Sequence, residues 1–223
     1  MQFFKVGGVV RDEMLGIDHN DVDYVAVCTD IATLSKAEAN AKLVQSFEEA
    51  GGKVYLHRPE YLTLLGQLHG QKVDVTVAHD ANFMPASLAT DLQNRDFTIN
   101  AMVEDSYGEV QDWFNSESDL LNCKIRTVLD PNITLEQDPI RVLRAIRLAI
   151  KLDFAFDKTL AEYIRSNDWT TAFASFKGSR LCAEVNKGLE LDKAFYLSLC
   201  AQFDLLSAIF DNVQVRVRPY ANT

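Results

Sequence analysis

The hydrophobic pattern of this 223-residue chain changes its period near Asp130-Pro131-Asn132. Before that point, short β-rich apolar runs alternate with glycine turns, and we interpret these runs as strands over residues 3–6, 22–28, 53–57, 61–68 and 72–79. After it, apolar residues recur with a helical period over residues 138–151, 157–166, 177–189 and 192–206. We therefore expect an α+β fold, with a mixed-sheet head over residues 1–129 and a small all-α neck or body region over residues 130–223.

Turn and cap residues predict the remaining elements. A helix is expected over residues 9–15, ended by Gly16, and another from an Asp30 N-cap to about residue 50. The other expected elements are a polar loop over 80–90, a hairpin of strands 97–103 and 109–112, a helix over 118–122, a strand over 124–128 and a closing strand or ordered tail over 213–219.

The net charge of −10 argues against a simple nucleic-acid binder, but the charge is unevenly distributed. Residues 1–140 carry 10 Lys and Arg against 23 Asp and Glu, whereas residues 141–223 carry 12 against 9. An acidic front half suits metal binding and a basic rear half suits phosphate, although solubility alone explains the overall charge equally well.

Cysteine usage and hydropathy indicate a cytoplasmic protein that binds no membrane. The four cysteines are scattered without a Cys-x-x-Cys pair, which favours reduced, packed thiols over a zinc site or a disulfide framework. No apolar run approaches the length of a membrane span, and the first residues show no signal-peptide pattern.

Gly7 and Gly8 stand where the first predicted strand gives way to a helix. Two glycines let the backbone approach a ligand closely, and the free N–H groups at a helix start can bind phosphate. Arg11, one turn further on, can add a charge-assisted contact to a triphosphate. A Gly-Gly pair is more often only a turn, so this motif alone leaves both interpretations open.

Three aspartates lie on two predicted strands. Asp21 and Asp23 are two residues apart, so their carboxylates face one side of a strand, where like charges are costly unless a cation binds between them. Asp74 is a lone acid inside a strongly β-forming run. If the two strands are neighbours, the three carboxylates form a cage suited to Mg²⁺; solvated aspartates are the alternative.

Two further segments bring polar side chains together. Arg95 and Asp96 precede a predicted strand that would place Thr98 and Asn100 on one face, which suggests a ligand pocket or an ordinary ion pair beside a polar face. In the second segment, Asp138 is predicted to be an N-cap and Pro139 to be the first helical residue. Asp138, Arg141 and Arg144 then share a helix face, as they also would in a plain amphipathic helix.

In order and spacing, the four motifs together resemble the class II tRNA nucleotidyltransferases, the CCA-adding enzymes, and their bacterial poly(A) polymerase relatives. The residues that match the family's first pattern are Gly7, Gly8, Arg11, Asp12, Gly16, Asp21 and Asp23. Its Arg-Asp-Phe-Thr-Ile-Asn-Ala segment is matched by residues 95–101, and its Asp-Pro-x-Arg-x-x-Arg segment by Asp138, Pro139, Arg141 and Arg144. Arg180 and Glu184 form a weaker match to the family pattern.

The resemblance implies a polymerase β-like nucleotidyltransferase head that adds C and A to the tRNA 3′ end from CTP and ATP, without a template. It further implies tRNA as partner, no DNA, and location in the cytoplasm, or the host cytoplasm for a phage-encoded chain. Two Mg²⁺ ions would be held by Asp21, Asp23 and Asp74. The nucleotide would be bound by Gly7, Gly8, Arg11, Arg95, Asp96, Asn100, Asp138, Arg141 and Arg144.

Base choice follows from hydrogen-bond polarity. Cytosine and adenine each offer an amino donor beside a ring-nitrogen acceptor, which Asp138 and Arg141 can match, whereas guanine and uracil reverse the pattern. Two unmet buried groups, at about 1–3 kcal/mol each, predict discrimination of ~100-fold or more.

The chain departs from the family at several positions. Gln137, Asn94, Ser116 and His79 replace the family's usual Glu, Arg, Gly and Arg. The segment after His79 is short and has no Lys or Arg, where family members commonly have a longer basic loop linked to adding the final A. The chain ends at Thr223, where bacterial members continue, so we expect either a compact phage-like enzyme or a truncated copy.

Other functions stay open. A CC-only or poly(A)-type polymerase would use the same chemistry on a different product. A catalytically silent RNA-binding homologue is disfavoured by the three intact carboxylates. A nucleotidyltransferase that acts on a small molecule or a protein is disfavoured by the Asp138 and Arg141 pair.

Overall fold

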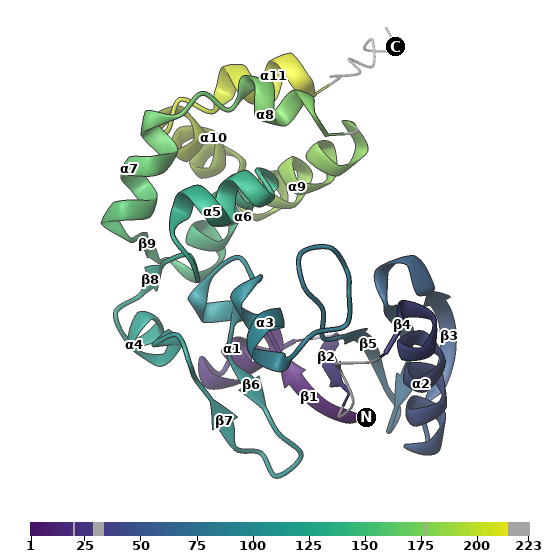
Figure 1. Cartoon of the computed structure of the whole chain (residues 1–223). Helices are drawn as coiled ribbons and strands as arrows, with labels where there is room; N and C mark the ends of the chain where they lie inside the picture. Colours follow the sequence, from purple (N-terminus) through teal and green to yellow (C-terminus); the bar gives the residue numbers. More distant parts are fainter. Residues whose placement is uncertain (20, 29–33, 177, 214–223) are drawn as a thin grey trace, which may run out of the picture. The chain divides into compact units, whose positions relative to one another are not determined.

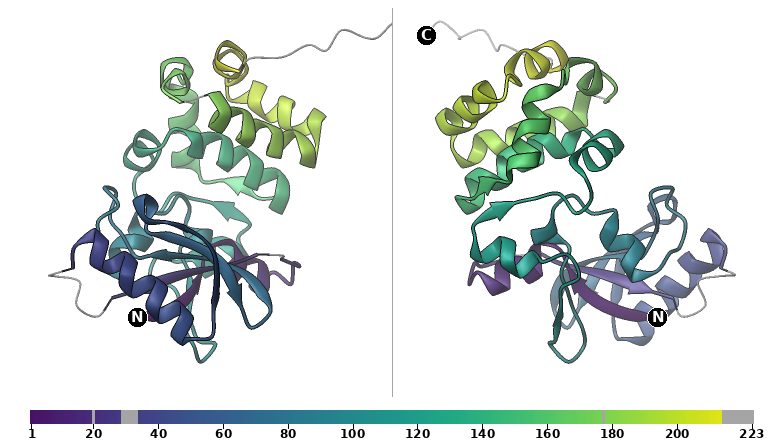
Figure 2. Two further views of the ribbon diagram at one scale, coloured as in Figure 1. Left: turned by 90° about the vertical axis from the view of Figure 1, so that its right-hand side faces the viewer. Right: turned by 60° about the vertical axis from the view of Figure 1, so that its left-hand side comes forward.

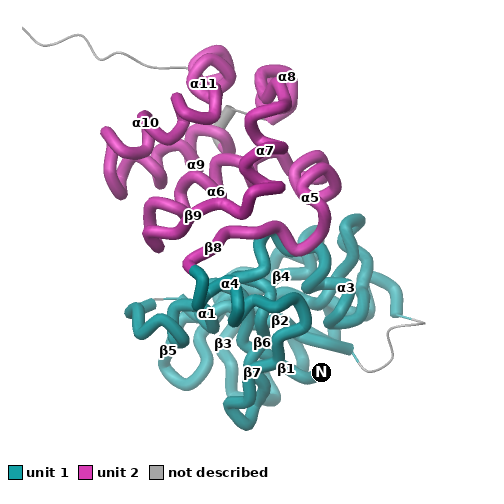
Figure 3. The backbone as a smooth tube through the Cα atoms, turned by 90° about the vertical axis from the view of Figure 1, so that its left-hand side faces the viewer, with its two compact units in different colours: residues 1–122 teal, residues 123–223 magenta. Residues whose placement is uncertain are grey.

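The computed structural model describes residues 1–19, 21–28, 34–176 and 178–213. The chain divides into two compact units, Met1–Asn122 and Cys123–Thr223, shown in two colours in Figure 3. Of the expected terminal strand over 213–219, residues 214–219 lie outside the described part.

Unit 1 is built on a seven-stranded sheet with strand order β3-β4-β5-β2-β1-β6-β7 (Figure 1). The strands are β1 (Gln2–Val6), β2 (Val22–Val27), β3 (Lys53–Arg58), β4 (Thr63–Leu68), β5 (Gln71–Val77), β6 (Val103–Glu104) and β7 (Val110–Gln111). β2 and β5 pair in parallel, whereas β1 pairs antiparallel with β2, as β4 does with β5. The predicted mixed sheet is therefore confirmed.

The helical elements of unit 1 are α1 (Gly8–Met14), α2 (Lys36–Glu49), α3 (Leu88–Gln93), α4 (Ser116–Leu121) and the 3-10 turns η2 (Pro59–Tyr61) and η3 (Thr98–Asn100). Figure 2 shows α2 lying across the strands. Phe47 of α2 is fully buried there against Gly66 of β4, where a Cβ would come within 2.7 Å of its ring. The core between the sheet and α3 includes Val25 and Leu92.

Two sequence-based boundaries in unit 1 were wrong. The helix expected from Asp30, a residue outside the described part, begins at Lys36 because Ser35 and Glu38 form a reciprocal capping box. The predicted loop over 80–90 gives way to α3 at Leu88, which Ser87 caps by accepting from the Thr90 N–H.

The predicted strand over 97–103 is also wrong, because its first half folds as the 3-10 turn η3. Asp96 accepts hydrogen bonds from the Phe97 N–H, at 2.8 Å, and from the Asn100 amide, at 3.0 Å, which closes a turn. The Thr98 hydroxyl donates to Asp119 at 2.6 Å. Local side-chain bonds thus outweigh the β-forming composition, and only the predicted hairpin of β6 and β7 remains extended.

Unit 2 is mainly helical. Its elements are the short parallel strands β8 (Lys124–Ile125) and β9 (Ala155–Phe156) and the helices α5 (Pro131–Gln137), α6 (Ile140–Leu152), α7 (Lys158–Ser166), α8 (Thr170–Ala174), α9 (Gly178–Leu191), α10 (Lys193–Gln202) and α11 (Leu206–Asn212). The predicted helix over 138–151 begins at Ile140, and the one over 192–206 is split between α10 and α11. In the described part of the chain no single helix is long and apolar enough to cross a membrane.

Gly188 of α9 faces the fully buried ring of Tyr196 on α10, and a Cβ at this glycine would lie 2.1 Å from the ring. Alanine favours a helix over glycine by about 1 kcal/mol. Overpacking of a tight core costs about 1–3 kcal/mol, so we expect Gly188→Ala to lower the free energy of unfolding. Urea unfolding measures this change in the free energy of unfolding, and Asn186→Ala, at an exposed position of the same helix, is the control. A more stable Gly188→Ala protein would contradict this packing.

Candidate active site

The parallel register of β2 and β5 pairs Asp23 directly with Asp74. Asp21 lies just before the first residue of β2, and all three aspartates line one pocket of about 380 Å³. The sequence left open whether the two strands are neighbours, and the sheet places them side by side. The three predicted carboxylates are therefore brought together in unit 1.

Asp74 is the half-buried member of this group, and its Oδ1 has no hydrogen-bond partner among the described residues. Burial, followed by the charge of Asp23, raises the pKa of Asp74 to about 6; Asp21 adds to the rise and Arg58 opposes it. An orphaned carboxylate oxygen beside a second carboxylate is suited to a hard divalent cation. Arg58 of β3 was not singled out in the sequence, where it is one charged residue of an exposed strand.

The carboxylates do not form a tightly gathered metal site. Within the described ranges, no group of three or more His, Cys, Asp or Glu side chains lies close enough together to hold a metal ion. Asp21 and Asp23 are both exposed. The residues fit Mg²⁺ because their ligand atoms are carboxylate oxygens and one oxygen of Asp74 has no partner in the part of the chain that the structure describes. Instead of the closed cage that the sequence predicted, the three aspartates line an open pocket.

The Gly7–Gly8 turn joins β1 to α1 beside two guanidinium groups. Gly7 has a φ of +80°, the left-handed region that glycine adopts freely. A Cβ at Gly7 would lie 3.1 Å from Nη1 of Arg95, and one at Gly8 would lie 3.2 Å from Nη2 of Arg11. Arg95 pairs with Asp91 at 3.1 Å. The turn and both predicted arginines are thus neighbours, and a side chain at either glycine would crowd them.

A buried polar network supports this turn. Arg11 is only 4% exposed; it donates to Asp12 Oδ1 from Nε, at 2.8 Å, and from Nη2, at 2.6 Å, and its Nη1 donates to Asn100 Oδ1. The Asn100 amide donates in turn to Asp96. Arg11, Asp96 and Asn100 are thus one network that ties α1 to η3. The triphosphate contact predicted for Arg11 stays a prediction, and here its guanidinium is engaged within the protein.

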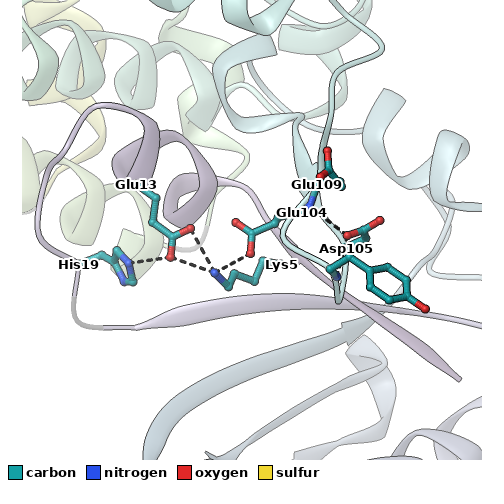
Figure 4. Close-up of polar contacts among 7 residues, drawn as sticks. Lys5, Glu13, His19, Glu104, Asp105 and Glu109 are labelled. Carbon is teal, nitrogen blue, oxygen red and sulfur yellow. Dashed lines mark hydrogen bonds and ion pairs between the residues drawn. The ribbon is translucent and has the colours of Figure 1, made fainter.

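An ion-pair cluster stands at the other end of α1 (Figure 4). Lys5 of β1 lies between Glu13 of α1, at 3.1 Å, and Glu104 of β6, at 2.8 Å, and His19 contacts Glu13 at 3.2 Å. Burial alone would lower the pKa of Lys5, but its hydrogen bonds and charge interactions with Glu104 and Glu13 raise it. These contacts therefore connect β1, α1 and β6, and they include His19 in the segment that leads to Asp21.

Asp138 lies between α5 and α6 in unit 2, and its predicted role as an N-cap is wrong. It ends α5 in an extended conformation, and Pro139 occupies the N-cap of α6. Its Oδ2 instead accepts from Nη2 of Arg180 at 2.6 Å, while Oδ1 has no hydrogen-bond partner among the described residues. The carboxylate is used for a tertiary ion pair through one oxygen, and the other oxygen is buried without a hydrogen-bond partner in the described part of the chain.

The arginines of α6 lie on one face, as predicted. Arg141 and Arg144 are half-buried between fully buried neighbours, and Arg141 Nη1 donates to the Thr134 carbonyl and to Gln137 Oε1, both at 3.1 Å. Gln137, a departure from the family pattern, is therefore a hydrogen-bond acceptor for Arg141.

Two residues of α9 complete this region and were only weakly indicated by the sequence. Arg180 pairs with Asp138, and Glu184 pairs with Arg147 at 2.5 Å. Their spacing of four residues places both on one face of α9. That spacing was the available signal, but it does not identify partners about 40 residues away.

Comparison with known proteins supports the family resemblance. A family model described as "Poly A polymerase head domain" matches residues 3–126. The CCA-adding enzyme of Limosilactobacillus reuteri (strain DSM 20016) is 34% identical over 169 residues, which cover 74% of this chain and 40% of the relative. The CCA-adding enzyme of Francisella tularensis subsp. tularensis (strain FSC 198) is 31% identical over 221 residues, which cover 96% of this chain and 58% of the relative. The chain thus spans about half the length of these relatives.

Solved structures confirm the expected fold class. The crystal structure of the Bacillus stearothermophilus CCA-adding enzyme in complex with CTP matches with a TM-score of 0.79 at 27% identity, covering 92% of this chain and 49% of that one. A tRNA nucleotidyltransferase complexed with a primer tRNA and an incoming ATP analog matches with a TM-score of 0.78 at 29% identity, covering 96% and 61%.

The raised pKa of Asp74 predicts a pH-dependent loss of folding stability when no metal is bound. The folded chain holds this proton more tightly than the unfolded chain, so the free energy of unfolding falls as pH rises from about 4 to about 6. We expect Asp74→Asn to be more stable than wild type at pH 7.5 by roughly 1 kcal/mol, after allowance for solvent screening, and the gap to close near pH 4.

Urea unfolding with a chelator present measures this gap. Asp211→Asn, exposed on α11, controls for the loss of one charge. Mg²⁺ should stabilise the wild type more than Asp74→Asn. Equal stability of the two proteins at pH 7.5 would show that Asp74 carries no such cost.

Proposed function

The chain belongs to the poly(A) polymerase head-domain family, and we propose that it acts as a class II tRNA nucleotidyltransferase. In this role it adds C and A to the 3′ end of tRNA from CTP and ATP. The observation that carries this proposal is the pairing of Asp23 with Asp74 in a pocket that Asp21 also lines. The nucleotide and tRNA complexes of similar structures support the choice of substrates.

Unit 1 supplies the reaction centre. Asp21, Asp23 and Asp74 would hold two Mg²⁺ ions, which when bound supply positive charge at the α-phosphate and lower the pKa of the attacking hydroxyl. The backbone of Gly8 and the guanidinium of Arg95 bind the triphosphate. The network of Arg11, Asp96 and Asn100 keeps the turn in place, because each of its side chains is buried and hydrogen-bonded.

Unit 2 supplies base selection and binds RNA. Asp138 accepts from the amino group of cytosine or adenine, and Arg141 donates to the ring nitrogen. Arg180 orients Asp138, and Gln137 and the Thr134 carbonyl orient Arg141. Arg144 follows on the same face of α6 and adds positive charge. The excess of Lys and Arg in residues 141–223 suits the tRNA backbone.

Addition of C alone is the second candidate, and the segment between β5 and α3 favours it. Asp80 Oδ1 accepts from the backbone N–H groups of Asn82, at 2.8 Å, and Met84, at 2.9 Å. This turn carries neither Lys nor Arg. A short, internally bonded segment offers little that could rearrange the site from CTP to ATP.

The length of the product separates these functions. We expect the protein, with Mg²⁺ and a tRNA that lacks CCA, to add three residues only when CTP and ATP are both present, measured at single-nucleotide resolution. Asp23→Ala should lose activity by several orders of magnitude and keep its melting temperature. Addition of two residues with CTP and no further step with ATP would identify the CC-only enzyme. Absence of any addition by the wild type would favour the silent homologue.

Base selection tests the assignment of unit 2. We expect Asp138→Ala to reduce discrimination against GTP and UTP by roughly 10-fold, since one unmet group costs about 1–3 kcal/mol. Arg180→Ala should have a smaller effect in the same direction, because Asp138 keeps its charge and loses its orientation. The ratios of kcat/KM for the four nucleotides measure both, with Asp211→Ala as the control. Unchanged rejection of GTP and UTP in Asp138→Ala would refute the assignment.

A further inference from the structure

The pocket that contains the three carboxylates extends over β3 and β4. Besides the aspartates, its lining residues are Tyr55, Leu56, Leu65, Gly66, Lys72 and Val73. Tyr55 is 54% exposed and Leu56 is 43% exposed, although both are large and apolar or aromatic. The volume of about 380 Å³ lies within the range of small-ligand pockets. A solvent-facing apolar wall beside a charged centre is typical of a binding surface.

The sheet places this wall on one side of the carboxylates and the Gly7–Gly8 turn on the other. β5 and β2, which carry Asp74 and Asp23, lie between β4 and β1 in the strand order. On one side, the pairing of Lys5 with Tyr24 brings the end of β1, and so the turn, beside the start of β2. On the other side, Leu65 of β4 pairs with Asp74, and Leu56 of β3 pairs with Leu65.

The chemistry of phosphoryl transfer gives the two sides different ligands. In an in-line displacement, the attacking and leaving oxygens lie on opposite sides of the phosphorus atom. The proposed function assigns the leaving pyrophosphate to the side of Gly8 and Arg95. The attacking 3′-hydroxyl then arrives from the side of β4 and β3.

Resting on that proposed function, we propose that the wall of Tyr55, Leu56 and Leu65 binds the 3′-terminal nucleotide of the RNA acceptor. The base stacks on the Tyr55 ring and packs on the two leucines, and Lys72 contacts the terminal phosphodiester. Lys53 Nζ lies 5.9 Å from the Tyr55 ring centre and adds positive charge beside the stacking surface. Positive charge around an aromatic surface is the combination that single-stranded nucleic acid prefers.

The same wall does not read the identity of the base. The Tyr55 hydroxyl is used internally, donating to Gln67 Oε1 at 2.8 Å, and the leucines have no polar side-chain atoms. Stacking tolerates any base, because every base has a π face. This indifference suits an acceptor whose last residue changes after each addition. The terminal base should therefore affect binding far less than loss of the aromatic ring does.

Equilibrium binding of an acceptor RNA tests the proposal without requiring turnover. A fluorescently labelled tRNA acceptor stem with a single-stranded 3′ end is titrated with the full chain in Mg²⁺ and without nucleotide. We expect Tyr55→Ala to raise Kd roughly 10-fold and Tyr55→Phe to bind like the wild type, since stacking needs the ring alone. Lys72→Ala should raise Kd and reduce its salt dependence. Exchanging the terminal base should change Kd by less than about 3-fold.

The matched control is Tyr107→Ala, because Tyr107 is 90% exposed on the β6–β7 hairpin and does not line the pocket. It should leave acceptor binding and activity unchanged. An acceptor with 4-thiouridine at its 3′ end should form its photo-crosslink with the segment 53–58 or with residues 65–73. In steady state, Tyr55→Ala should raise the KM for the acceptor and leave the KM for CTP unchanged.

The outcomes separate this proposal from the proposed function. Wild-type activity with unchanged acceptor Kd in Tyr55→Ala, or a crosslink elsewhere, would overturn the pocket assignment alone. A raised KM for CTP with an unchanged KM for the acceptor would give the wall to the incoming nucleotide instead and also overturn it. Ring-dependent acceptor binding by a wild type that adds no nucleotide would support the pocket and reject the transferase.

Discussion

The site depends on one pairing, the parallel contact of β2 with β5 that sets Asp23 beside Asp74. Burial, followed by the charge of the neighbouring Asp23 carboxylate, raises the pKa of Asp74 to about 6. A fold would not retain this arrangement for stability alone. The cost of holding these carboxylates side by side is a reason to regard the pocket that they line as a cation site.

Other polar side chains of the candidate site, in contrast, are hydrogen-bonded or ion-paired within the protein. Arg11 is buried, and its guanidinium is shared between Asp12 and Asn100, so the Gly7–Gly8 turn is connected to η3 by charge-assisted bonds. Lys5 joins α1 to β6 through Glu13 and Glu104. In unit 2 the same principle applies to Asp138, which Arg180 holds by one oxygen. The Gly7–Gly8 turn and Asp138, both proposed to contact substrate, are thus held in place by hydrogen bonds and ion pairs with neighbouring side chains.

Several features of the site could be predicted from sequence because their signals are local. The i, i+2 spacing of Asp21 and Asp23 and the three-residue spacing of Arg141 and Arg144 follow from the strand and helix periods, and the Gly-Gly turn follows from the backbone freedom of glycine. The strand expected over 97–103 failed for a related reason: its composition favours β structure, but Asp96, Thr98 and Asn100 form local side-chain bonds that close a turn.

Periodicity, caps and an ordered set of motifs were enough to predict the α+β class, the mixed-sheet head and the three candidate carboxylates. Which side chains meet depends on the tertiary structure. Asp23 and Asp74 are 51 positions apart, and Asp138 and Arg180 are 42 apart. The wall of Tyr55 and Leu65 needs three neighbouring strands to exist. Such contacts depend on strand order and helix packing, which the free energy of the whole core selects and no local pattern encodes.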